Sequence, residues 1–376
     1  MTIVFFSNFI NHHQVGVADE LYRLTDGNYY FVCTQEMPES FRKVGYPDYS
    51  SRPYAIKAYN GKESYEFALH LAETADVAIF GGNDEIQLFR DVRLKKGLLS
   101  FECGERWLKK GILNLLSPRL IKSQWHYHTK YYKASNYYAL CMSGYASEDY
   151  RLLRSFKDKC YKWAYFTKVD DLDLDGKIFI GNRIMWCNRF IDWKHPEMPI
   201  LLARRLKDAG YSFVIDMFGS GAMVEKINKL SESLEVKDCV NIKGNLPNEL
   251  IREEMYRHDI LLTTSDKNEG WGATVNEGMS NGCVLIGSNE VGSVKFLIND
   301  EVNGLIFKSN DLSSLFDKVT SVINKPEKCN LLAKNAYITM KEIWSPENGA
   351  RKLLTLINCL MNNNPIEFSE GPCSKC

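Results

Sequence analysis

The chain contains 376 residues, of which 45% are hydrophobic and 12% aromatic, enough apolar material for the cores of two domains of ordinary size. Its 47 basic residues balance 47 acidic ones, so no overall field attracts nucleic acid, and we expect no nucleic-acid partner. The eleven cysteines lack the paired spacing of a secreted disulfide framework, and no apolar run suits a signal peptide or a membrane span. We therefore expect a protein of the reducing cytoplasm, either soluble or peripheral at the inner face of the cell membrane.

Short apolar runs alternate with helical patterns in the first part of the chain. Strands are expected at residues 3–6, 29–33, 77–80, 98–101 and 138–142, which predicts a parallel α/β sheet in a first domain over residues 1–166. His12 and His13 follow the first strand, and Glu105 and Arg106 follow the fourth. Ligands bind at the carboxyl ends of such strands, so these four residues are candidate ligand contacts. For the histidines, the alternative is a helix cap or a solvated position.

An acidic connection over residues 170–176 separates the two halves. Asp171, Asp173 and Asp175 have the spacing of a calcium loop, but Asn182 stands where that loop requires a bidentate Glu. We expect a solvated linker and no bound metal.

The second half continues the alternation, with strands expected at residues 177–182 and 184–187 and a helix at residues 199–209. Arg189 and Lys194 bracket the loop between strand and helix. A guanidinium and an ammonium group suit a diphosphate, because both form charged hydrogen bonds to phosphate oxygens. The next strand, at residues 213–218, leads into Gly219 and Gly221. The third glycine and the acidic ribose ligand of a nicotinamide site are missing, so we expect a tight turn near a ligand and no cofactor.

Residues 265–282 form the most informative stretch of the chain. A strand at residues 259–264 precedes a loop with Glu269, and a short helix is expected from about Ala273 to Gly282. The first backbone N–H groups of this helix, at Gly272, Ala273 and Thr274, and its positive dipole end favour a phosphate. Glu277 lies one turn inside the helix, so the two glutamates flank a ligand of the nucleotide-sugar kind. The alternative is an ordinary surface loop with two solvated glutamates.

This stretch resembles the glutamate-pair signature of retaining glycosyltransferases of family 4, which have the GT-B fold of two facing Rossmann-like domains. The resemblance implies that Glu269 meets the donor sugar, that Glu277 binds the ribose and that the amides between them hold the diphosphate. The spacing of Arg189 and Lys194 matches the family's phosphate-binding pair. Gly219 matches its glycine turn, and Gly244, Asn245 and Leu246 match its base-reading segment.

The same resemblance predicts the domain plan and the activity. It implies a nucleotide-sugar domain over residues 167–345 and a helix over residues 346–362 that crosses back to the first domain. The residues after this helix, 363–376, are expected to form a loose tail. The expected activity is transfer of a sugar, with retention, from a nucleoside-diphosphate sugar, UDP being the expected nucleotide. The expected acceptor is a hydroxyl of a glycan or lipid-linked saccharide in cell-surface polysaccharide biosynthesis. The alternatives are an epimerase or phosphorylase of the same fold, or a non-catalytic sensor of sugar nucleotides.

The segment between Arg106 and Ser147 is basic although the protein is neutral. It contains no acidic residue and seven basic ones: Arg106, Lys109, Lys110, Arg119, Lys122, Lys130 and Lys133. Aromatic residues and an apolar run at residues 111–116 lie between these cations in the sequence. This mixture suits the headgroup layer of an anionic membrane. The alternative is a solvated basic helix whose aromatic residues belong to the core.

Overall fold

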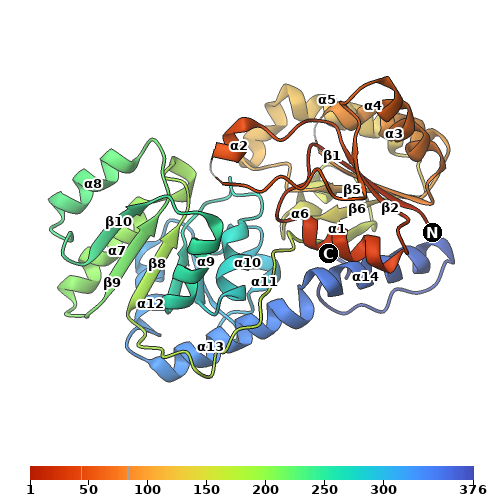
Figure 1. Ribbon diagram of the computed structural model, residues 1–376. Coiled ribbons are helices and arrows are strands. Elements are labelled where there is room, and N and C mark those ends of the chain that lie inside the picture. Colours follow the sequence, from red (N-terminus) through yellow and green to blue (C-terminus); the bar gives the residue numbers. More distant parts are fainter. Residues whose placement is uncertain (44, 83) are drawn as a thin grey trace. The chain divides into compact units, whose positions relative to one another are not determined.

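The computed structural model describes residues 1–43, 45–82 and 84–376. The chain forms two compact units. Unit 1 comprises Met1–Lys168 and Ile343–Cys376, and unit 2 comprises Val169–Glu342. Each unit contains one parallel sheet covered by helices (Figure 1).

The sheet of unit 1 has the strand order β3-β2-β1-β4-β5-β6-β7, and all neighbouring strands are parallel. Consecutive order breaks between β1 and β4, a position where α/β sheets open a crevice at the carboxyl ends of their strands. The strands are β1 (Ile3–Ser7), β2 (Tyr29–Cys33), β3 (Ala55–Lys57), β4 (Val77–Gly81), β5 (Ser100–Gly104), β6 (Tyr137–Cys141) and β7 (Cys160–Lys162).

Helices alternate with these strands, as the sequence pattern predicts. They are α1 (Val15–Leu24), α2 (Glu39–Lys43), α3 (Lys62–Thr74), η1 (Asp84–Ile86), α4 (Gln87–Lys95), η2 (Gly111–Leu116), α5 (Pro118–His126), η3 (Tyr127–Tyr131) and α6 (Ala146–Leu152).

The C-terminal helix α14 (Pro346–Met361) belongs to unit 1 and packs against α1 (Figure 1). Two glycines permit the close packing. A Cβ atom at Gly16 would lie 3.0 Å from a side-chain carbon of Pro346, and one at Gly349 would lie 2.4 Å from the ring of Phe166. The predicted return of this helix to the first domain is confirmed.

Unit 2 has a six-stranded parallel sheet with the order β10-β9-β8-β11-β12-β13. Its central strands are buried on both faces, which is why they read as continuous apolar runs. The strands are β8 (Arg183–Cys187), β9 (Val214–Phe218), β10 (Val240–Gly244), β11 (Ile260–Thr263), β12 (Val284–Ser288) and β13 (Leu305–Phe307). The helices are η4 (Asp192–Lys194), α7 (Glu197–Asp208), α8 (Val224–Ser233), α9 (Asn248–Arg257), α10 (Ala273–Ser280), α11 (Val294–Leu297), α12 (Leu312–Thr320) and α13 (Pro326–Ile338), followed by η5 (Thr339–Ile343).

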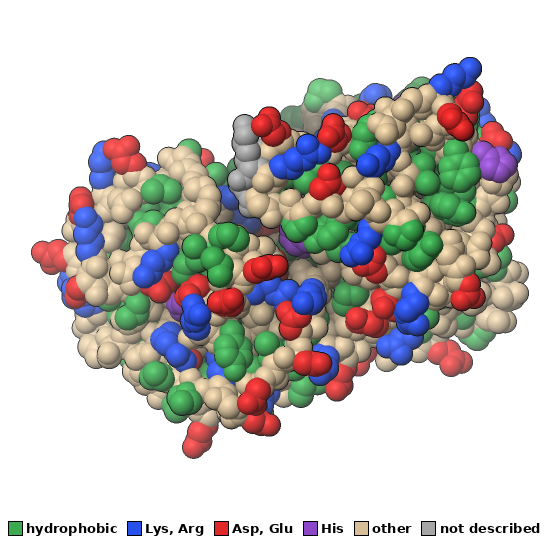
Figure 2. Space-filling model, in the orientation of Figure 1, with side chains coloured by type: hydrophobic (Ala, Val, Ile, Leu, Met, Phe, Trp, Pro, Cys, Tyr) green, Lys and Arg blue, Asp and Glu red, His purple; other side chains and the backbone are tan. Residues whose placement is uncertain are grey.

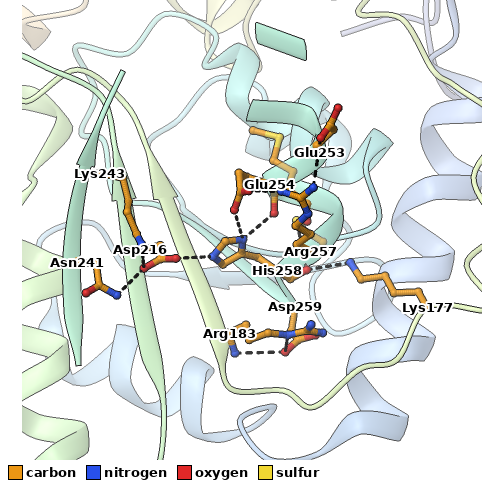
Figure 3. Close-up of polar contacts among 12 residues, drawn as sticks. Lys177, Arg183, Asp216, Asn241, Lys243, Glu253, Glu254, Arg257, His258 and Asp259 are labelled. Carbon is orange, nitrogen blue, oxygen red and sulfur yellow. Dashed lines mark hydrogen bonds and ion pairs between the residues drawn. The ribbon is translucent and has the colours of Figure 1, made fainter. Parts of the chain in front are cut away.

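A polar cluster fixes the end of α9 to the sheet (Figure 3). The ring of His258 lies between the Glu254 carbonyl oxygen, 2.6 Å from Nδ1, and the Asp216 carboxylate on β9, 3.3 Å from Nε2. Asn241 on β10 donates a 2.7 Å hydrogen bond to the same carboxylate. These contacts set where β11 begins, and β11 leads directly to the loop that carries Glu269.

The strand expected at residues 177–182 does not form, and its partners explain why. The buried Lys177 ammonium donates to the carbonyl oxygens of His258 and Gly282, at 2.8 and 2.7 Å. The Asp259 carboxylate accepts from the Gly181 N–H at 3.0 Å and from the Arg183 side chain (Figure 3). Side-chain contacts thus replace the backbone ladder of a strand.

The acidic connection is held by separate partners. Lys341 and Lys334 contact Asp171 and Asp175 at 2.6 and 2.5 Å, and Asp173 accepts from the Gly176 N–H at 2.9 Å. These three carboxylates therefore act as anchors of an exposed linker.

The expectation of a loose tail is wrong for its last residues. Cys373 and Ser374 are buried, and they exchange 2.8 Å backbone hydrogen bonds with Lys162 on β7. Lys375 also forms an antiparallel bridge with Tyr161. Because β7 is the edge strand of its sheet, the tail covers backbone groups that would otherwise be open for pairing.

The surface is mixed in charge. Acidic and basic side chains are interspersed over the face seen in Figure 2, which agrees with their equal numbers. Within the described residues, no helix is both long and apolar enough to cross a membrane.

Candidate functional site

The candidate site lies at the carboxyl edge of the sheet of unit 2, where α10 begins. The helix starts at Ala273, as the sequence predicts, and its N-cap residue Gly272 has a φ of 90°. A Cβ atom there would lie 2.8 Å from Cγ1 of Val291, so conformation and space both require glycine. Among the described residues no side chain caps this helix start. The first N–H groups, at Ala273 and Thr274, therefore remain available to an anion.

Lys194 and Glu269, 75 positions apart in sequence, form an ion pair next to this helix start. Their side chains are only 10% and 16% exposed. Two hydrogen bonds hold the loops that carry them: Asp266 donates its N–H to the Trp193 carbonyl oxygen at 3.0 Å, and the Thr264 hydroxyl donates to the Lys194 carbonyl oxygen at 2.7 Å. The sequence nominates both charged residues, but it does not reveal that they contact each other.

His195 is a third charged contact in these loops, and sequence reasoning missed it. Its backbone has a φ of 49°, and its ring lies 2.7 Å from Glu197 at Nδ1 and 3.5 Å from Asp266 at Nε2. The hydrogen bond with Glu197 is the main cause that raises the pKa of His195. The signal that could have identified it is its position: it follows Lys194 directly and comes two residues before Glu197, the first residue of α7.

Arg189 lies on the loop that leads from β8 to Lys194. It is exposed, and its guanidinium lies 5.7 Å from the centre of the Trp193 ring. No acidic side chain among the described residues pairs with it. A cation held over an aromatic face and free of a carboxylate is suited to receive a phosphate.

The glycine turn after β9 runs against this same loop. A Cβ atom at Gly219 would lie 1.9 Å from the Asn188 carbonyl oxygen, and one at Gly221 would lie 2.3 Å from that of Phe190. The Gly219 N–H donates to the Gly244 carbonyl oxygen at 2.9 Å, and Asn245 donates to the Ser220 hydroxyl at 2.8 Å. The turn is therefore joined to the segment of Gly244, Asn245 and the half-buried Leu246.

Glu277 lies one turn inside α10, and its Oε1 accepts a 3.0 Å hydrogen bond from Asn248 at the start of α9. Burial raises the pKa of Glu277, while the hydrogen bond from Asn248 and the charge of Arg252 oppose that rise. Arg252 is itself held by Asp170 at 2.9 Å. The sequence did not point to Asn248. An Asn that follows a Pro is common at the start of a helix, so its position gave no sign of the contact with Glu277.

His12 and His13 lie in unit 1 on the loop between β1 and α1. The ring of His12 lies 4.6 Å from that of Tyr46, and His13 stacks on Tyr165 with the ring centres 5.0 Å apart. Burial lowers the pKa of His12 to about 4, and burial together with His12 lowers that of His13. Both imidazoles are therefore neutral at pH 7 and can act as hydrogen-bond partners, not as cations.

Glu105 and Arg106, after β5, are engaged within unit 1. Glu105 accepts hydrogen bonds from Lys109 and Tyr165, at 2.6 and 2.8 Å. The Arg106 guanidinium lies 3.3 Å from Asp149 and 4.9 Å from the centre of the Tyr145 ring. These contacts hold both side chains at the end of β5, and their role as ligand contacts stays a prediction.

The basic segment acquires acidic partners from outside it. Besides the contacts of Arg106 and Lys109, Lys130 pairs with Asp91 at 2.9 Å, and Lys122 lies 3.9 Å from Asp84. Tyr127 and Tyr131 are buried, as the alternative interpretation predicts for aromatic residues of the core. However, seven of the 23 exposed large apolar side chains that the structure describes lie between residues 112 and 132: Ile112, Leu113, Leu115, Leu116, Ile121, Trp125 and Tyr132.

Comparisons with known proteins identify the class of unit 2. Residues 181–339, which include its whole sheet, match the family model of glycosyl transferases group 1. The poly(glycerol-phosphate) alpha-glucosyltransferase of Bacillus subtilis (strain 168) is 25% identical over 134 residues. These residues are 36% of this chain and only 19% of that protein.

Solved structures resemble the chain over nearly its whole length. TarM matches with a TM-score of 0.69 at 11% identity, covering 95% of this chain and 98% of the other. HepE from Anabaena, solved with UDP and glucose, matches with a TM-score of 0.66 at 12% identity, covering 95% and 99%. Likeness at such identities shows the fold alone, and it confirms the predicted class: GT-B, with two Rossmann-like α/β domains.

Proposed function

We propose that this protein is a retaining glycosyltransferase of the family 4 kind, which transfers a sugar from a UDP-sugar to a hydroxyl of a glycan or lipid-linked saccharide in cell-surface polysaccharide biosynthesis. The observation that carries the proposal is the Lys194–Glu269 ion pair beside the open N-terminus of α10. One cation, one carboxylate and the backbone N–H groups of Ala273 and Thr274, which no side chain of the described residues caps, lie together there. A nucleoside-diphosphate sugar complements these groups: its diphosphate is negative, and its sugar becomes positive as the glycosidic bond breaks.

Each residue of the site then has a distinct task. The helix start and Lys194 bind the diphosphate, and Arg189 adds a second cation to it. Negative charge grows on this leaving group as the glycosidic bond breaks, so these donors stabilise the transition state more than the ground state. Glu277 accepts hydrogen bonds from the ribose hydroxyls, and the segment around Gly244 contacts the base through its backbone.

Glu269 interacts with the positive charge that develops on the sugar. Positive charge develops on the sugar ring as the bond to phosphate lengthens, and a carboxylate held by Lys194 stabilises it. Lys194 is neutralised by Glu269 in their ion pair. When a diphosphate binds, Lys194 is shared between the phosphate and Glu269, which keeps the carboxylate fixed during the reaction. Retention then follows from attack on the face that the leaving phosphate vacates, with a phosphate oxygen accepting the proton of the acceptor hydroxyl.

The nature of the donor and acceptor rests on the relatives. The HepE structure contains UDP and glucose, and the Bacillus protein is named as a glucosyltransferase acting on poly(glycerol phosphate). These names support a UDP-sugar as the donor and a cell-surface polymer or its lipid-linked precursor as the acceptor.

Thermal stabilisation by nucleotide sugars tests the donor site. A ligand that binds only the folded protein at a hundred times its Kd adds about 2.7 kcal/mol of stability. We expect a rise in Tm with at least one UDP-sugar, and a smaller rise in Glu277→Ala. Equal Tm values with and without every nucleotide sugar of a broad panel would contradict the proposal.

The exposed apolar residues of η2 and α5 support contact with an anionic membrane. Lys110, Arg119, Lys122 and Lys133 are exposed in the same segment, so exposed cations alternate in sequence with exposed apolar side chains. Apolar groups that enter the headgroup layer and cations near anionic lipids both favour binding, at about 1 kcal/mol for each basic residue. A membrane-bound position would bring the enzyme to a lipid-linked acceptor.

Sedimentation with vesicles tests this contact. We expect the protein to pellet with vesicles of anionic phospholipid, to be released by salt, and to remain in solution with neutral vesicles. The double variant Leu116→Ser/Trp125→Ser should lose most of the binding. Leu331→Ser, which changes a residue of unit 2 that is 61% exposed, is the matched control and should not. Equal pelleting with both vesicle types, or none with either at low salt, would leave a soluble acceptor as the better hypothesis.

A further inference from the structure

His195 lies between two carboxylates that come from different segments of unit 2. It ends the short helix η4 with a left-handed backbone, at a φ of 49° and a ψ of 57°, a conformation that few residues other than glycine adopt. Its Nδ1 lies 2.7 Å from Glu197 at the start of α7, and its Nε2 lies 3.5 Å from Asp266 on the loop after β11. The imidazole ring therefore joins the start of α7 to the loop that carries Glu269.

Asp266 organises the turn that ends at Glu269. Its Oδ1 accepts hydrogen bonds from the backbone N–H and the side-chain amide of Asn268, at 2.8 and 2.9 Å. Its backbone carbonyl oxygen accepts the Glu269 N–H at 3.0 Å. An aspartate that binds the backbone two residues further along in this way fixes a tight turn. The remaining oxygen, Oδ2, is the one that faces His195, so a movement of this carboxylate would shift the turn and Glu269 with it.

The charges around the ring favour its protonated form. His195 and Asp266 are only 20% and 19% exposed, so water screens their contact little. The hydrogen bond with Glu197 is the main cause that raises the pKa of His195, burial opposes this rise, and the charges of Glu197 and Asp266 add to it. Two cations lie nearby: Lys194 is paired with Glu269, and Lys226 of α8 acts on Glu197.

The protonation state of His195 decides whether its contact with Asp266 is attractive. An imidazolium ring has an N–H for each carboxylate, whereas a neutral imidazole has only one N–H. The shorter contact, with Glu197, keeps that N–H, so the lone pair of Nε2 then faces the Asp266 carboxylate. A contact of 3.5 Å is longer than an ordinary hydrogen bond and is mainly electrostatic, so loss of the proton turns it from attraction to repulsion.

We propose that His195 is a positioning residue for sugar transfer: its imidazolium holds Asp266, and Asp266 fixes the turn that carries Glu269. His195 itself touches no reacting atom. Without its charge the turn is free to move, and a displacement of about 1 Å at a reacting centre is enough to slow an enzyme strongly. The effect on turnover rests on the proposed function, whereas the effect on the turn does not.

The pH profile of kcat at saturating donor tests the effect on turnover. We expect kcat of the unchanged protein to fall about tenfold between about pH 6 and pH 9, as His195 loses its proton above its ordinary pKa of about 6.5. In Asp266→Asn this fall should disappear, because the amide oxygen can still accept from Asn268 while its NH₂ group donates to the Nε2 of a neutral ring.

Two further variants complete the kinetic test. His195→Gln should have a kcat about tenfold lower already near pH 6, with the Kd for UDP by calorimetry within about threefold of the normal value. His70→Gln, which removes an exposed histidine of α3, is the matched control and should keep the profile of the unchanged protein. A fall of kcat with pH that persists in Asp266→Asn, or a change in His195→Gln confined to KM, would overturn the proposal even if UDP-sugar turnover is found.

Hydrogen exchange measured by mass spectrometry tests the turn without any substrate. At one pH near 6, where His195 carries its proton in the unchanged protein, peptides that contain residues 266–269 should exchange faster in His195→Gln than in the unchanged protein or in His70→Gln. This result would support the hold of His195 on the turn even if no UDP-sugar is a donor. Equal exchange in all three proteins would overturn it, whatever the enzymatic activity.

Discussion

Replacing Glu269 by Gln separates sugar chemistry from nucleotide binding. The change keeps the shape of the side chain and removes its charge. Because Lys194 and Glu269 are only 10% and 16% exposed, water compensates little for the lost pair. A charged hydrogen bond is worth about 1.5–3 kcal/mol, so the free energy of unfolding should fall by about that amount.

The effect on the two functions should differ. Lys194 keeps its charge in Glu269→Gln and is no longer neutralised, so the Kd for the nucleoside diphosphate should stay within about threefold or become lower. Loss of one preorganised charge that stabilises the transition state typically lowers kcat by about 10²–10³. We expect a decrease of that order, measured as steady-state release of nucleoside diphosphate in the presence of acceptor.

Calorimetry with the diphosphate and urea denaturation complete the test. Glu225→Gln, which changes an exposed glutamate of α8 that also pairs with a lysine, is the matched control and should leave all three quantities unchanged. Turnover in Glu269→Gln that survives within about threefold, less than 1 kcal/mol of barrier, would refute the role of this carboxylate. So would a loss of diphosphate affinity with normal kcat.

Three further predictions follow from neighbouring contacts. Glu277→Ala should weaken binding of the nucleoside diphosphate about ten- to a hundredfold by calorimetry, because the ribose loses a charged acceptor; unchanged affinity would exclude it as the ribose ligand. Asn248→Ala should raise the KM for the donor with little change in kcat, because Asn248 positions Glu277 and touches no reacting atom; an equal fall in kcat with unchanged KM would argue against this. The raised pKa of His195 means that its contribution to stability is complete below about pH 6.5 and is lost as the pH rises through the folded-state pKa. Urea denaturation of the wild type and His195→Gln should therefore differ most near pH 5.5 and least near pH 8.5, and a difference that grows with pH would contradict the sign.

Local patterns predicted most of the sheets correctly, and the exceptions have physical causes. The short continuous apolar run of β11 indicates a strand buried on both faces, and a glycine before Ala273 is compatible with a helix start. Residues 177–182 alternate like a strand, but their polar groups bind Asp259 and the carbonyl oxygens of distant residues. The burial of Cys373 likewise depends on β7, more than 200 positions away, so it cannot be derived from the composition of the tail.

In the site, too, local features could be predicted from the sequence, whereas contacts between distant segments could not. The kinds of residue that a diphosphate needs were visible at Arg189 and Lys194, because charge and loop position are local properties. The contact of Lys194 with Glu269 joins two loops, and that of Asn248 with Glu277 joins two helices. The basic segment looked free of acidic partners because Asp84, Asp91 and Asp149 lie outside it in sequence and reach it only in the fold.

The central claim is that a sugar is transferred from a nucleotide to an acceptor hydroxyl at the Lys194–Glu269 site. Mass spectrometry and NMR of a panel of UDP-sugars, incubated with the protein with and without saccharide acceptors, test this most directly. We predict that one UDP-sugar is consumed substantially only when an acceptor is present, that the new glycosidic bond keeps the anomeric configuration of the donor, and that Glu269→Gln slows the reaction about 10²–10³-fold. Inversion at C2 of the donor sugar without acceptor, consumption that requires inorganic phosphate, or tight nucleotide-sugar binding with no turnover would contradict the claim and identify an epimerase, a phosphorylase or a sensor instead.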